Sequence, residues 1–522
     1  MPTTIIDSDF KMKNISRSTL YWVDKENKTG IEDLAQKRDS PIFQKVEKDS
    51  PAFSFSDDKF WFVFNLKNRT SEKQNLIIEV KYQLLDSVTL FQKGPDDRYI
   101  AFQSGDHTPY KSKIVKSRNP AFQITLPRDS EQEFFLAVKT EGTVHVPLYL
   151  WKTEAFYENN QKESIFFGII FGILFAMLCY NLFLFSILKD LSYLYYVLYI
   201  TGMLLFQISI NGFAYTMIFT ESPLFAGESI VITVLITSLG VILFSRQFLN
   251  LQKMFPVWNR LILVQVVVHI LAFLLVIFTS YNFNIRFVNI LLGITTATAL
   301  SAGVVTMLKG YKPARLFMLA WGVVLIAGIV FVLKDRGILP KTFLTQNGVS
   351  IGAAIESILL SVALSFRIKL IEKARLDAEL KLISEKKRIS TDIHDNVGSD
   401  LTSLIFSLKQ DAETSPKVGR IVDKLDIILY KIRDIIYLKD LDTNFNQNLE
   451  EHMETLIRKI ERSGKHKIKF VYDTIGHQLS VENAVHLHRV FQEWMTNILR
   501  HSNGKSIDIF WQKKRGRPGW LL

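Results

Sequence analysis

The middle of the chain consists of long apolar runs that carry almost no charge. Seven such runs follow one another, at 164–188, 191–211, 229–245, 261–285, 287–308, 316–333 and 343–366. A transmembrane helix needs roughly 20 consecutive apolar residues, and most of these runs have about that length. One run alone could be a buried core helix, but seven in succession predict seven membrane spans. We therefore expect a seven-helix membrane domain at 164–366.

The region before the membrane domain has short apolar stretches instead. Six of them are rich in Phe, Val, Ile and Tyr and are separated by turn-forming residues: 60–66, 75–82, 87–92, 121–127, 133–139 and 144–151. Strands at this spacing without intervening helices favour a β-sandwich, which we place at 1–160. Trp61, Phe62 and Trp151 could stack on a sugar or another flat ligand, but core aromatics are the simpler interpretation. His107 fits a turn.

The region after the membrane domain has the periodicity of packed helices. Residues 367–388 carry Leu376, Leu380 and Ile383 near heptad spacing, which predicts a signalling helix that continues the last span. Two amphipathic stretches follow within 389–443, with apolar residues at positions 389, 393, 397, 401, 404 and 408, then 418, 421, 425, 428, 432 and 435. One helical hairpin buries little surface, so we expect a homodimer that forms a four-helix bundle.

Composition agrees with this division and excludes several classes of protein. The 522 residues are 48% apolar and 22% charged, which excludes a disordered or fibrous chain. Cys179 is the single cysteine, which excludes an internal disulfide and a cysteine-based zinc cluster. The net charge of +12 does not form a basic surface, because the excess lies in loops and near the C-terminus. We therefore expect the lipid bilayer, and no nucleic acid, as a partner.

Lys and Arg in the short loops indicate the orientation, because cytoplasmic loops carry more of them. With the N-terminus outside, the inner loops hold Lys189, Arg246, Lys253, Arg260, Lys309, Lys312 and Arg315, and the outer loops hold Arg286, Lys334, Arg336 and Lys341. This bias favours an outer N-terminus and a C-terminus in the cytoplasm. The first 20 residues contain no apolar signal core, so we expect the natural start of the protein to lie upstream.

Glu356 interrupts the last predicted span. An acid there is costly unless it faces the interior of the helix bundle, so we expect a polar partner on another helix or a role in relaying the state of the ligand. A hydrogen-bonded structural acid is an equal alternative. A transporter would be a further interpretation of the whole chain if Glu356 bound an ion, but the predicted spans lack paired charges.

The segment RISTDIHDNVGSDLT resembles the phosphoacceptor box of sensor histidine kinases, in the subfamily whose box is RIxxDxHDxxGxxL. The matching positions are Arg388, Ile389, Asp392, His394, Asp395, Gly398 and Leu401. With a β-sandwich and seven spans before the box, the chain is similar to bacterial seven-transmembrane receptors with diverse intracellular signalling modules. The resemblance implies a bacterial cytoplasmic (inner) membrane, an extracytoplasmic small ligand such as a carbohydrate, and a cytoplasmic response regulator as partner.

The same resemblance implies that His394 takes a phosphoryl group from ATP and passes it to an Asp of the regulator. A neutral imidazole is the nucleophilic form, and Asp395 can hold the proton on the other ring nitrogen and stabilise the developing charge. A solvated helix histidine is the alternative interpretation.

The subfamily uses a Gln or His one helical turn after the Asp of the box to orient water for dephosphorylation. Ser399 stands at that position here, so we expect weak phosphatase activity.

Downstream, the resemblance implies a gyrase-type α/β ATP-binding domain at 444–522. Residues 467–474 predict its first strand, and 485–511 predict its first helix and the next strand. Four polar residues of this helix share one face, namely Glu493, Asn497, Arg500 and His501. The resemblance assigns all four to the nucleotide site, with Asn497 on Mg²⁺ and the two basic residues on the ATP phosphates. A solvated helix face is the alternative.

The family also requires an Asp-x-Gly-x-Gly loop and a glycine-rich ATP lid, and neither motif occurs in these 522 residues. The stretch 512–522 predicts neither a strand nor a lid. We therefore expect a truncated ATP-binding domain in a histidine kinase, by resemblance an ATP:protein-histidine phosphotransferase, that keeps sensing, dimerisation and the phosphoacceptor. A non-catalytic receptor or dimerisation partner that modulates other kinases is the alternative from a different class.

Overall fold

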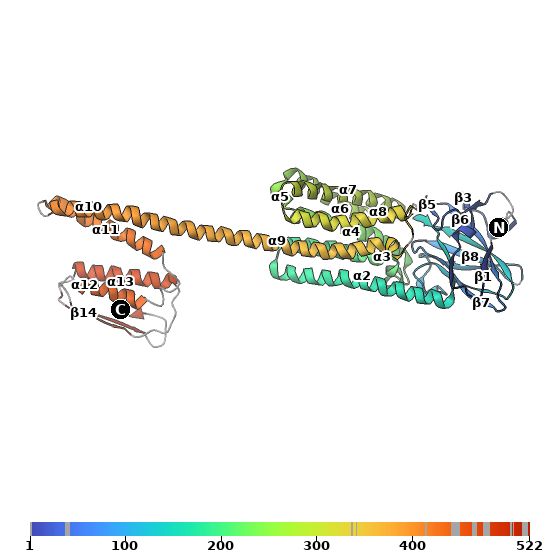
Figure 1. Cartoon of the computed structure of the whole chain (residues 1–522), viewed down its shortest axis with the longest axis horizontal. Helices are drawn as coiled ribbons and strands as arrows, with labels where there is room; N and C mark the ends of the chain where they lie inside the picture. Colours follow the sequence, from blue (N-terminus) through green and yellow to red (C-terminus); the bar gives the residue numbers. More distant parts are fainter. Residues whose placement is uncertain are drawn as a thin grey trace. The chain divides into compact units, whose positions relative to one another are not determined.

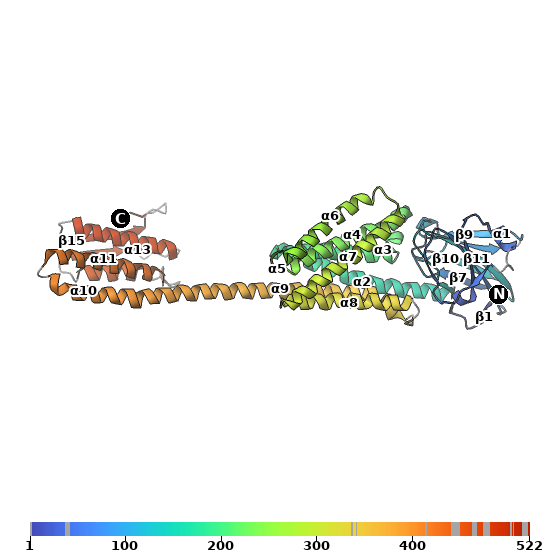
Figure 2. The ribbon, with the colours of Figure 1, turned by 90° about the horizontal axis from the view of Figure 1, so that it is seen from above.

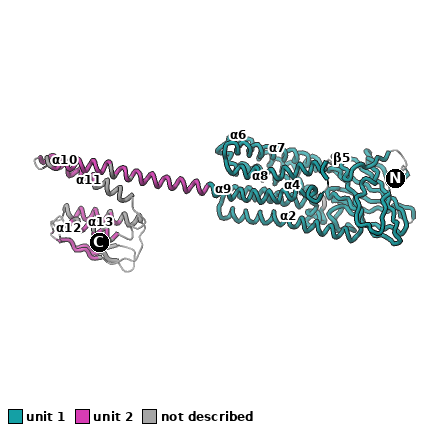
Figure 3. Tube along the Cα trace, viewed as in Figure 1, with its two compact units in different colours: residues 1–370 teal, residues 371–522 magenta. Residues whose placement is uncertain are grey.

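The computed structural model describes residues 3–36, 42–94, 96–335, 338–340, 342–412, 415–439, 449–461, 467–472, 481–501, 504, 506–513 and 520–521. The chain divides into two compact units, Met1–Leu370 and Ile371–Leu522, which Figure 3 shows in different colours. Each unit is described by itself. In the first unit, β-sheets are followed by seven apolar helices, as the sequence predicts.

The β-region contains two main sheets. Its strands are β1 (Thr3–Ile6), β2 (Met12–Asn14), β3 (Leu20–Asp24), β4 (Gln44–Lys45), β5 (Ala52–Phe55), β6 (Lys59–Asn68), β7 (Gln74–Val80), β8 (Ser87–Lys93), β9 (Tyr99–Ser104), β10 (Ala121–Leu126), β11 (Glu131–Lys139), β12 (Thr143–His145) and β13 (Leu148–Lys152). One sheet has the order β4-β3-β6-β11-β8-β9, with β1 parallel to β6, and the other has the order β10-β7-β13-β2. β5 and β12 pair with each other.

The two sheets pack face to face around one apolar core. Phe62 and Leu136 of the larger sheet and Ile78 of the smaller sheet belong to the same buried cluster, as a β-sandwich requires. Successive side chains of a strand point to opposite faces, so Trp61 lies on the outer face of the larger sheet, where Leu34 of α1 (Ile31–Gln36) covers it. Trp61 and Phe62 are 0% exposed and Trp151 is 5% exposed, so all three are core aromatics and not a stacking platform for a sugar.

Each predicted strand is present, but the last one is divided. The predicted stretch 144–151 forms β12 and β13, and Val146 and Pro147 separate them. Proline has no amide hydrogen to donate to a strand ladder, which explains the break. His107 lies in a turn between β9 and β10, as predicted.

Seven helices of the first unit are long and apolar enough to cross a membrane. They are α2 (Thr153–Leu188), α3 (Leu191–Ile210), α4 (Pro223–Phe248), α6 (Pro256–Leu275), α7 (Tyr281–Leu308), α8 (Pro313–Asp335) and α9 (Phe343–Asp392), and the short α5 (Leu251–Met254) precedes α6. Within this unit the sheets lie at one end of the helix bundle (Figure 1). α6 lies at the margin of the bundle in Figure 2, and its exposed Val264, Val267 and Leu271 suit contact with lipid.

The boundary between the fourth and fifth spans differs from the prediction. The apolar run 261–285 continues past the end of α6 at Leu275, and α7 begins only at Tyr281. The Asn284 side-chain amide donates to the backbone carbonyls of Val276 at 3.3 Å and Thr279 at 3.2 Å, which stabilises the turn between the helices. Arg286 consequently lies in α7 and not in an outer loop. The turn contains no charged residue, so the length of a charge-free run in the sequence does not reveal that the helix is interrupted there.

The last span continues without a break beyond the membrane domain. α9 is 50 residues long and includes 367–388, which confirms a helix that continues the last span. Near the end of the first unit, Arg367 of α9 forms an ion pair of 3.0 Å with Asp190, which lies between α2 and α3. The chain therefore leaves the bundle at the end where α2 meets α3, opposite the end at which it entered from the β-sandwich.

The second unit contains a helical hairpin and a small α/β layer. Its elements beyond α9 are α10 (Ser399–Ala412), α11 (Pro416–Lys439), α12 (Leu449–Glu461), β14 (Lys467–Tyr472), α13 (Val481–His501), β15 (Ser506–Lys513) and β16 (Trp520–Leu521). β14 and β15 are parallel. Met453 of α12, Phe491 of α13 and Ile507 of β15 share one buried cluster, so both helices pack on this sheet.

The prediction that 512–522 contains no strand is wrong. β15 continues to Lys513, and Trp520 and Leu521 pair with Lys513 and Gln512 in antiparallel register. Without β16, β15 would be an edge strand with unpaired backbone groups, and Trp520 and Leu521 pair with those groups. Aromatic residues such as Trp are common in strands.

Candidate functional site

The segment that carries the predicted phosphoacceptor motif joins α9 to α10. Its residues Ile393–Gly398 form a π-helical turn, whereas the sequence predicted one continuous α-helical stripe. The side chains of His394 and Asp395, which lie on this turn, are outside the part that the structure describes. π-Helical turns are rare and often occur at functional sites. Ser399, the position expected to orient water, begins α10 and is exposed.

α10 and α11 pack against each other as the predicted hairpin. Ile405 of α10 and Val422 and Leu429 of α11 are 5–6% exposed and form one apolar cluster. Partly buried Leu401 and Leu425 pack against it. The hairpin therefore has an apolar core of its own.

A second apolar face of the hairpin is exposed within this chain. It consists of Val397 and Leu404 on one side, at 42% and 47% exposure, and of Ile421 and Ile428 on the other, at 51% and 46%. We call these four residues the outer apolar face. Ile421 and Ile428 are seven residues apart in α11, so they lie on one side of that helix, whereas Val397 lies in the π-helical turn and Leu404 in α10. Aliphatic side chains in such a row are typical of a surface that another helix covers.

The expected nucleotide residues lie on α13. Glu493 and Asn497 are exposed, whereas Phe491 and Met495 face the sheet and are at most 3% exposed. An amide oxygen such as that of Asn497 is a suitable Mg²⁺ ligand, and its position leaves it accessible. The side chains of Arg500 and His501 are outside the described residues. The structure thus brings together two of the four predicted side chains, on the face predicted to be polar.

Polar contacts join α9 to α2 and α3 along the membrane domain, and we call them the polar seam. Its contacts are Ser350 Oγ to Gln207 Oε1 at 2.9 Å, Tyr199 OH to Glu356 Oε2 at 2.6 Å, Tyr196 OH to the Ser357 carbonyl at 2.5 Å, Asn181 Nδ2 to Ser361 Oγ at 3.1 Å, and Arg367 to Asp190 at 3.0 Å. Hydrogen bonds between membrane helices are worth about 0.6–2 kcal/mol each. The seam therefore fixes the rotation of α9, the helix that leaves the bundle.

The expected polar partner of Glu356 is confirmed as Tyr199 of α3, and Glu356 is 1% exposed. Glu356→Gln should lower the free energy of unfolding by about 1–3 kcal/mol, because a buried amide NH₂ would replace an oxygen and lack an acceptor. Tyr199→Phe, which removes only the donor, is the matched control and should cost about 1 kcal/mol. Thermal unfolding in detergent measures both. If Glu356→Gln changed neither stability nor signalling, both interpretations of Glu356 would fail.

Sequence reasoning missed the ion pairs where the β-sandwich meets the helices. Glu163 of α2 pairs with Lys81 Nζ at 2.7 Å and with Arg118. Burial alone would lower the pKa of Lys81, but the carboxylates of Glu163 and Glu79 outweigh it and raise that pKa. These residues are far apart in sequence, so no local pattern indicates that they meet.

A group of possible metal ligands lies at the same boundary. Oxygens of Asp86 and Asp106 and a ring nitrogen of His107 lie within 4.8 Å of one another. Burial, with Asp86 close by, raises the pKa of Asp106 to about 8, which weakens its ability to act as a ligand at neutral pH. Lys113 lies near Asp106, and burial lowers its pKa to about 8.

Comparison with known families agrees with this architecture. Residues 16–152 match the family described as 7TMR-DISM extracellular 2, and residues 163–367 match the family described as 7TM diverse intracellular signalling. The chain carries both 7TMR-DISM domains. It is thus a multi-pass membrane protein with an extracellular N-terminal domain, and the polar seam lies within the 7TMR-DISM membrane domain.

One curated relative connects the chain to signalling enzymes. Over 142 residues the chain is 30% identical to "Sensor histidine kinase YxjM" of Bacillus subtilis (strain 168). The match covers 24% of this chain and 33% of that protein. The chain spans about a third of the length of the relative that it matches. This is a weak homology to a sensor histidine kinase.

Proposed function

We propose that this 7TMR-DISM chain is a membrane sensor of the histidine-kinase type. His394 accepts a phosphoryl group, Asp395 orients its imidazole, and a response regulator takes the group from it. The observation that carries the proposal is the position of His394 and Asp395. They lie between the helix that continues the last span and a hairpin with its own core. When the chain is mixed with a related full-length kinase, label from ATP should enter it as acid-labile phosphohistidine, and the label should be absent from His394→Gln.

The continuity of α9 supports signal transfer from the membrane domain to His394. α9 is held by the polar seam in the bundle and continues to Asp392, two residues before His394. Any rotation of α9 in the bundle therefore reaches the phosphoacceptor turn directly. ATP and Mg²⁺ would supply the phosphoryl group and the charge neutralisation that its transfer needs. In this chain, Glu493, Asn497, Arg500 and His501 would contact them.

The outer apolar face supports a homodimer. Val397, Leu404, Ile421 and Ile428 expose apolar surface in rows that a second hairpin would cover. Leu404→Glu combined with Ile428→Glu should convert the detergent-solubilised dimer into a monomer. Phe406→Glu is the control, because Phe406 is 81% exposed but is not in either row. Light scattering of the purified chain gives the oligomeric state, and a dimer that survives both charges would contradict this arrangement.

The proposal includes a cytoplasmic C-terminus. The ion pair between Arg367 and Asp190 lies at the end of the bundle away from the extracellular domain. Reporter fusions at residues 150 and 370 should therefore indicate opposite sides of the membrane. Reports from the same side would exclude an odd number of spans between the two positions.

A non-catalytic receptor that modulates other kinases is the second candidate. The observation that favours it is the exposed outer apolar face, which would pair with a subunit of another kinase as readily as with a second copy of this chain. Such a receptor would still form dimers through the outer apolar face. It would differ in leaving His394 unphosphorylated under all conditions.

A further inference from the structure

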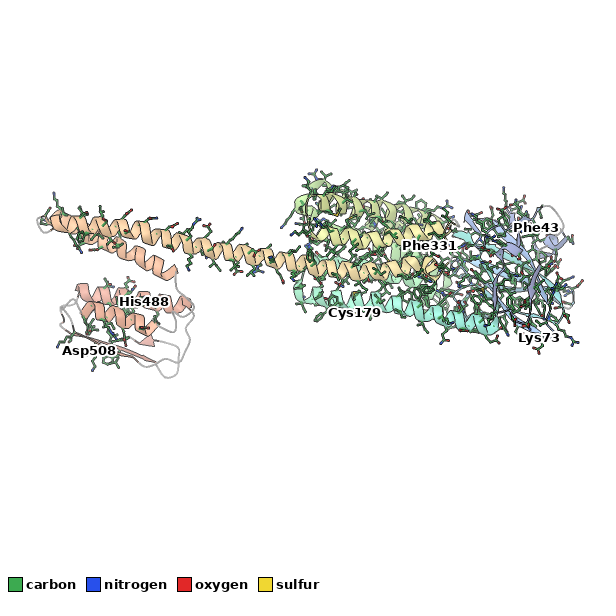
Figure 4. The ribbon with its side chains drawn as sticks, in the orientation of Figure 1. Phe43, Lys73, Cys179, Phe331, His488 and Asp508 are labelled. Atoms are coloured by element: carbon green, nitrogen blue, oxygen red, sulfur yellow. The ribbon has the colours of Figure 1, made fainter. Side chains whose placement is uncertain are left out.

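A cavity lies between the extracellular domain and the membrane helices of the first unit. It has a volume of about 460 Å³, within the range of about 300–1,000 Å³ that is usual for small-molecule sites. Its walls come from the residues that follow β7, from Arg118, and from the ends of α2, α3, α8 and α9 that lie nearest the β-sandwich. Phe331, labelled in Figure 4, marks the α8 wall.

The charged side chains that line this cavity are mostly cationic. They are Lys81, Arg118 and Lys334 against the single carboxylate of Glu163, an excess of two positive charges among the lining residues. Glu163 already pairs with Lys81 and Arg118, and the buried Glu79 also attracts Lys81, yet an ammonium has three donors and a guanidinium has five. The pair of cations can therefore hold a further anion beside Glu163.

Gln207 supplies an independent indication of a ligand. It lines the cavity and is 1% exposed, and its Nε2 has no hydrogen-bond partner among the described residues. Its Oε1 accepts from Ser350 Oγ at 2.9 Å and from Asn211 Nδ2 at 3.1 Å, which fixes the amide. A buried amide donor without a partner costs about 1–3 kcal/mol in general, so a ligand acceptor at this point would recover that loss.

The rest of the wall suits an apolar body. Phe167 of α2, Phe206 of α3 and Phe331 of α8 line the cavity from three helices, and Tyr149 of β13 lines it from the extracellular domain. Aromatic walls with a few fixed polar groups are typical of sites for small organic molecules. A bare inorganic ion fits this cavity less well than an organic molecule, because the ion would leave the aromatic surface uncovered.

The neighbouring cavity has the opposite charge. It has a volume of about 450 Å³, and its lining includes Asp86, Asp106, Glu141 and Glu228 but no Lys or Arg. An anion that reaches this boundary is therefore repelled from one cavity and attracted to the other.

We propose that the cation-lined cavity is the sensory site of this chain and binds a small organic carboxylate with an aromatic or aliphatic body. Lys81 and Arg118 hold the carboxylate, and Gln207 donates to a second oxygen of the ligand. Ser350 and Gln207 form the extracellular end of the polar seam, so the occupied site acts directly on α9. Binding is independent of whether His394 is phosphorylated.

The test uses the full chain in lipid nanodiscs and measures binding by calorimetry and thermal shift. The probes are phenylacetate, 4-hydroxyphenylacetate and pyruvate, with 4-hydroxyphenylacetamide as the uncharged control. At about 10 mM, a site with a dissociation constant near 1 mM is largely filled. We expect the 4-hydroxy acid to bind at least about tenfold more tightly than its amide, which corresponds to one charge-assisted contact.

Two variants and one control locate the site. Lys81→Met leaves Glu163 paired with Arg118, so it should fold, and it should weaken the acid about tenfold without affecting the amide. Gln207→Leu should weaken both. Lys111→Met is the matched control, because Lys111 pairs with Glu221 and does not line the cavity. The proposal is overturned if no acid binds, if acid and amide bind equally, or if Lys111→Met weakens binding as much as Lys81→Met.

Discussion

A protein that consists of residues 1–522 is expected to accept a phosphoryl group at His394 and yet fail to label itself with ATP. The proposed acceptor lies beside a hairpin whose buried cluster of Ile405, Val422 and Leu429 includes no described residue of the α/β layer. Donation instead requires a nucleotide pocket that holds the γ-phosphate and Mg²⁺. The 522 residues provide the helix with Glu493 and Asn497 but no Asp-x-Gly-x-Gly loop to bind adenine. Acceptance and donation should therefore separate.

The experiment mixes the purified chain with a related full-length kinase whose own acceptor histidine is replaced by Gln. With γ-labelled ATP, label should appear in this chain only in the mixture, through heterodimers. His394→Gln should abolish it, and His107→Gln, a half-exposed histidine of the extracellular domain, should leave it unchanged. Asp395→Asn should slow labelling about 10²-fold, since that is the usual scale of acid–base assistance.

Two results would contradict this expectation in different ways. Self-labelling of the isolated chain would mean that α13 and its sheet suffice to bind nucleotide. No labelling in the mixture, with dimers demonstrated, would mean that the π-helical turn does not present His394 as a nucleophile. The second result favours the non-catalytic receptor.

The membrane domain was predictable because its signal is physical and local. A span requires about 20 apolar residues, and seven helices satisfy that rule in the order expected, namely α2, α3, α4, α6, α7, α8 and α9. The errors lie where no charged residue marks the end of a helix, as in the turn at 276–280 between α6 and α7. The strands before residue 60, β1 to β5, and the later strand β9 were also missed. Of these, β1 and β3 pair along one edge of β6, a long-range contact that short stretches of sequence do not reveal.

The hairpin was predicted correctly, but the assignment of its buried face was incomplete. The predicted stripe included Leu404, Ile421 and Ile428, which are exposed, and it omitted Ile405 and Leu429, which form the core. Both helices have two apolar faces, and periodicity alone cannot decide which face meets the partner within the chain. The cation-lined cavity could not be predicted at all, because Lys81, Glu163 and Gln207 meet only in the folded unit.

The ion pair between Asp190 and Arg367 should control both the stability of the bundle and its output. Arg367 has 9% of its side chain exposed and Asp190 has 21%, so the pair is largely removed from water. Asp190 has a second role, because its Oδ1 accepts from the Ser192 amide at 2.7 Å and caps the start of α3. A single substitution at Asp190 can therefore remove one role or both.

Asp190→Asn keeps the cap, since Asn is as good an N-cap as Asp, and removes only the charge. Leaving a buried cation without its partner should lower the free energy of unfolding by about 3 kcal/mol. Asp190→Ala also loses the cap and should cost about 1 kcal/mol more. Thermal unfolding of the chain in nanodiscs gives both values.

The pH dependence has a definite sign. Burial would raise the pKa of Asp190, but hydrogen bonds from Ser192 and the charge of Arg367 outweigh it and lower that pKa below 3.8. A lowered native pKa means that the stabilisation is complete above the unfolded-state value and is lost only as the pH falls through the native one. The difference between wild type and Asp190→Asn should therefore stay constant from neutral pH down to about pH 4.

A double variant separates the charge from the packing. Asp190→Asn combined with Arg367→Met replaces both charges by neutral groups of similar size, and it should recover most of the stability that Asp190→Asn loses. Signalling should not recover, because α9 then lacks its link to the start of α3 at the end where it leaves the bundle, although the other contacts of the polar seam remain. A double variant as unstable as Asp190→Asn would show that the cost came from packing and not from the unpaired charge, and a double variant with normal signalling would show that this contact does not set the position of α9.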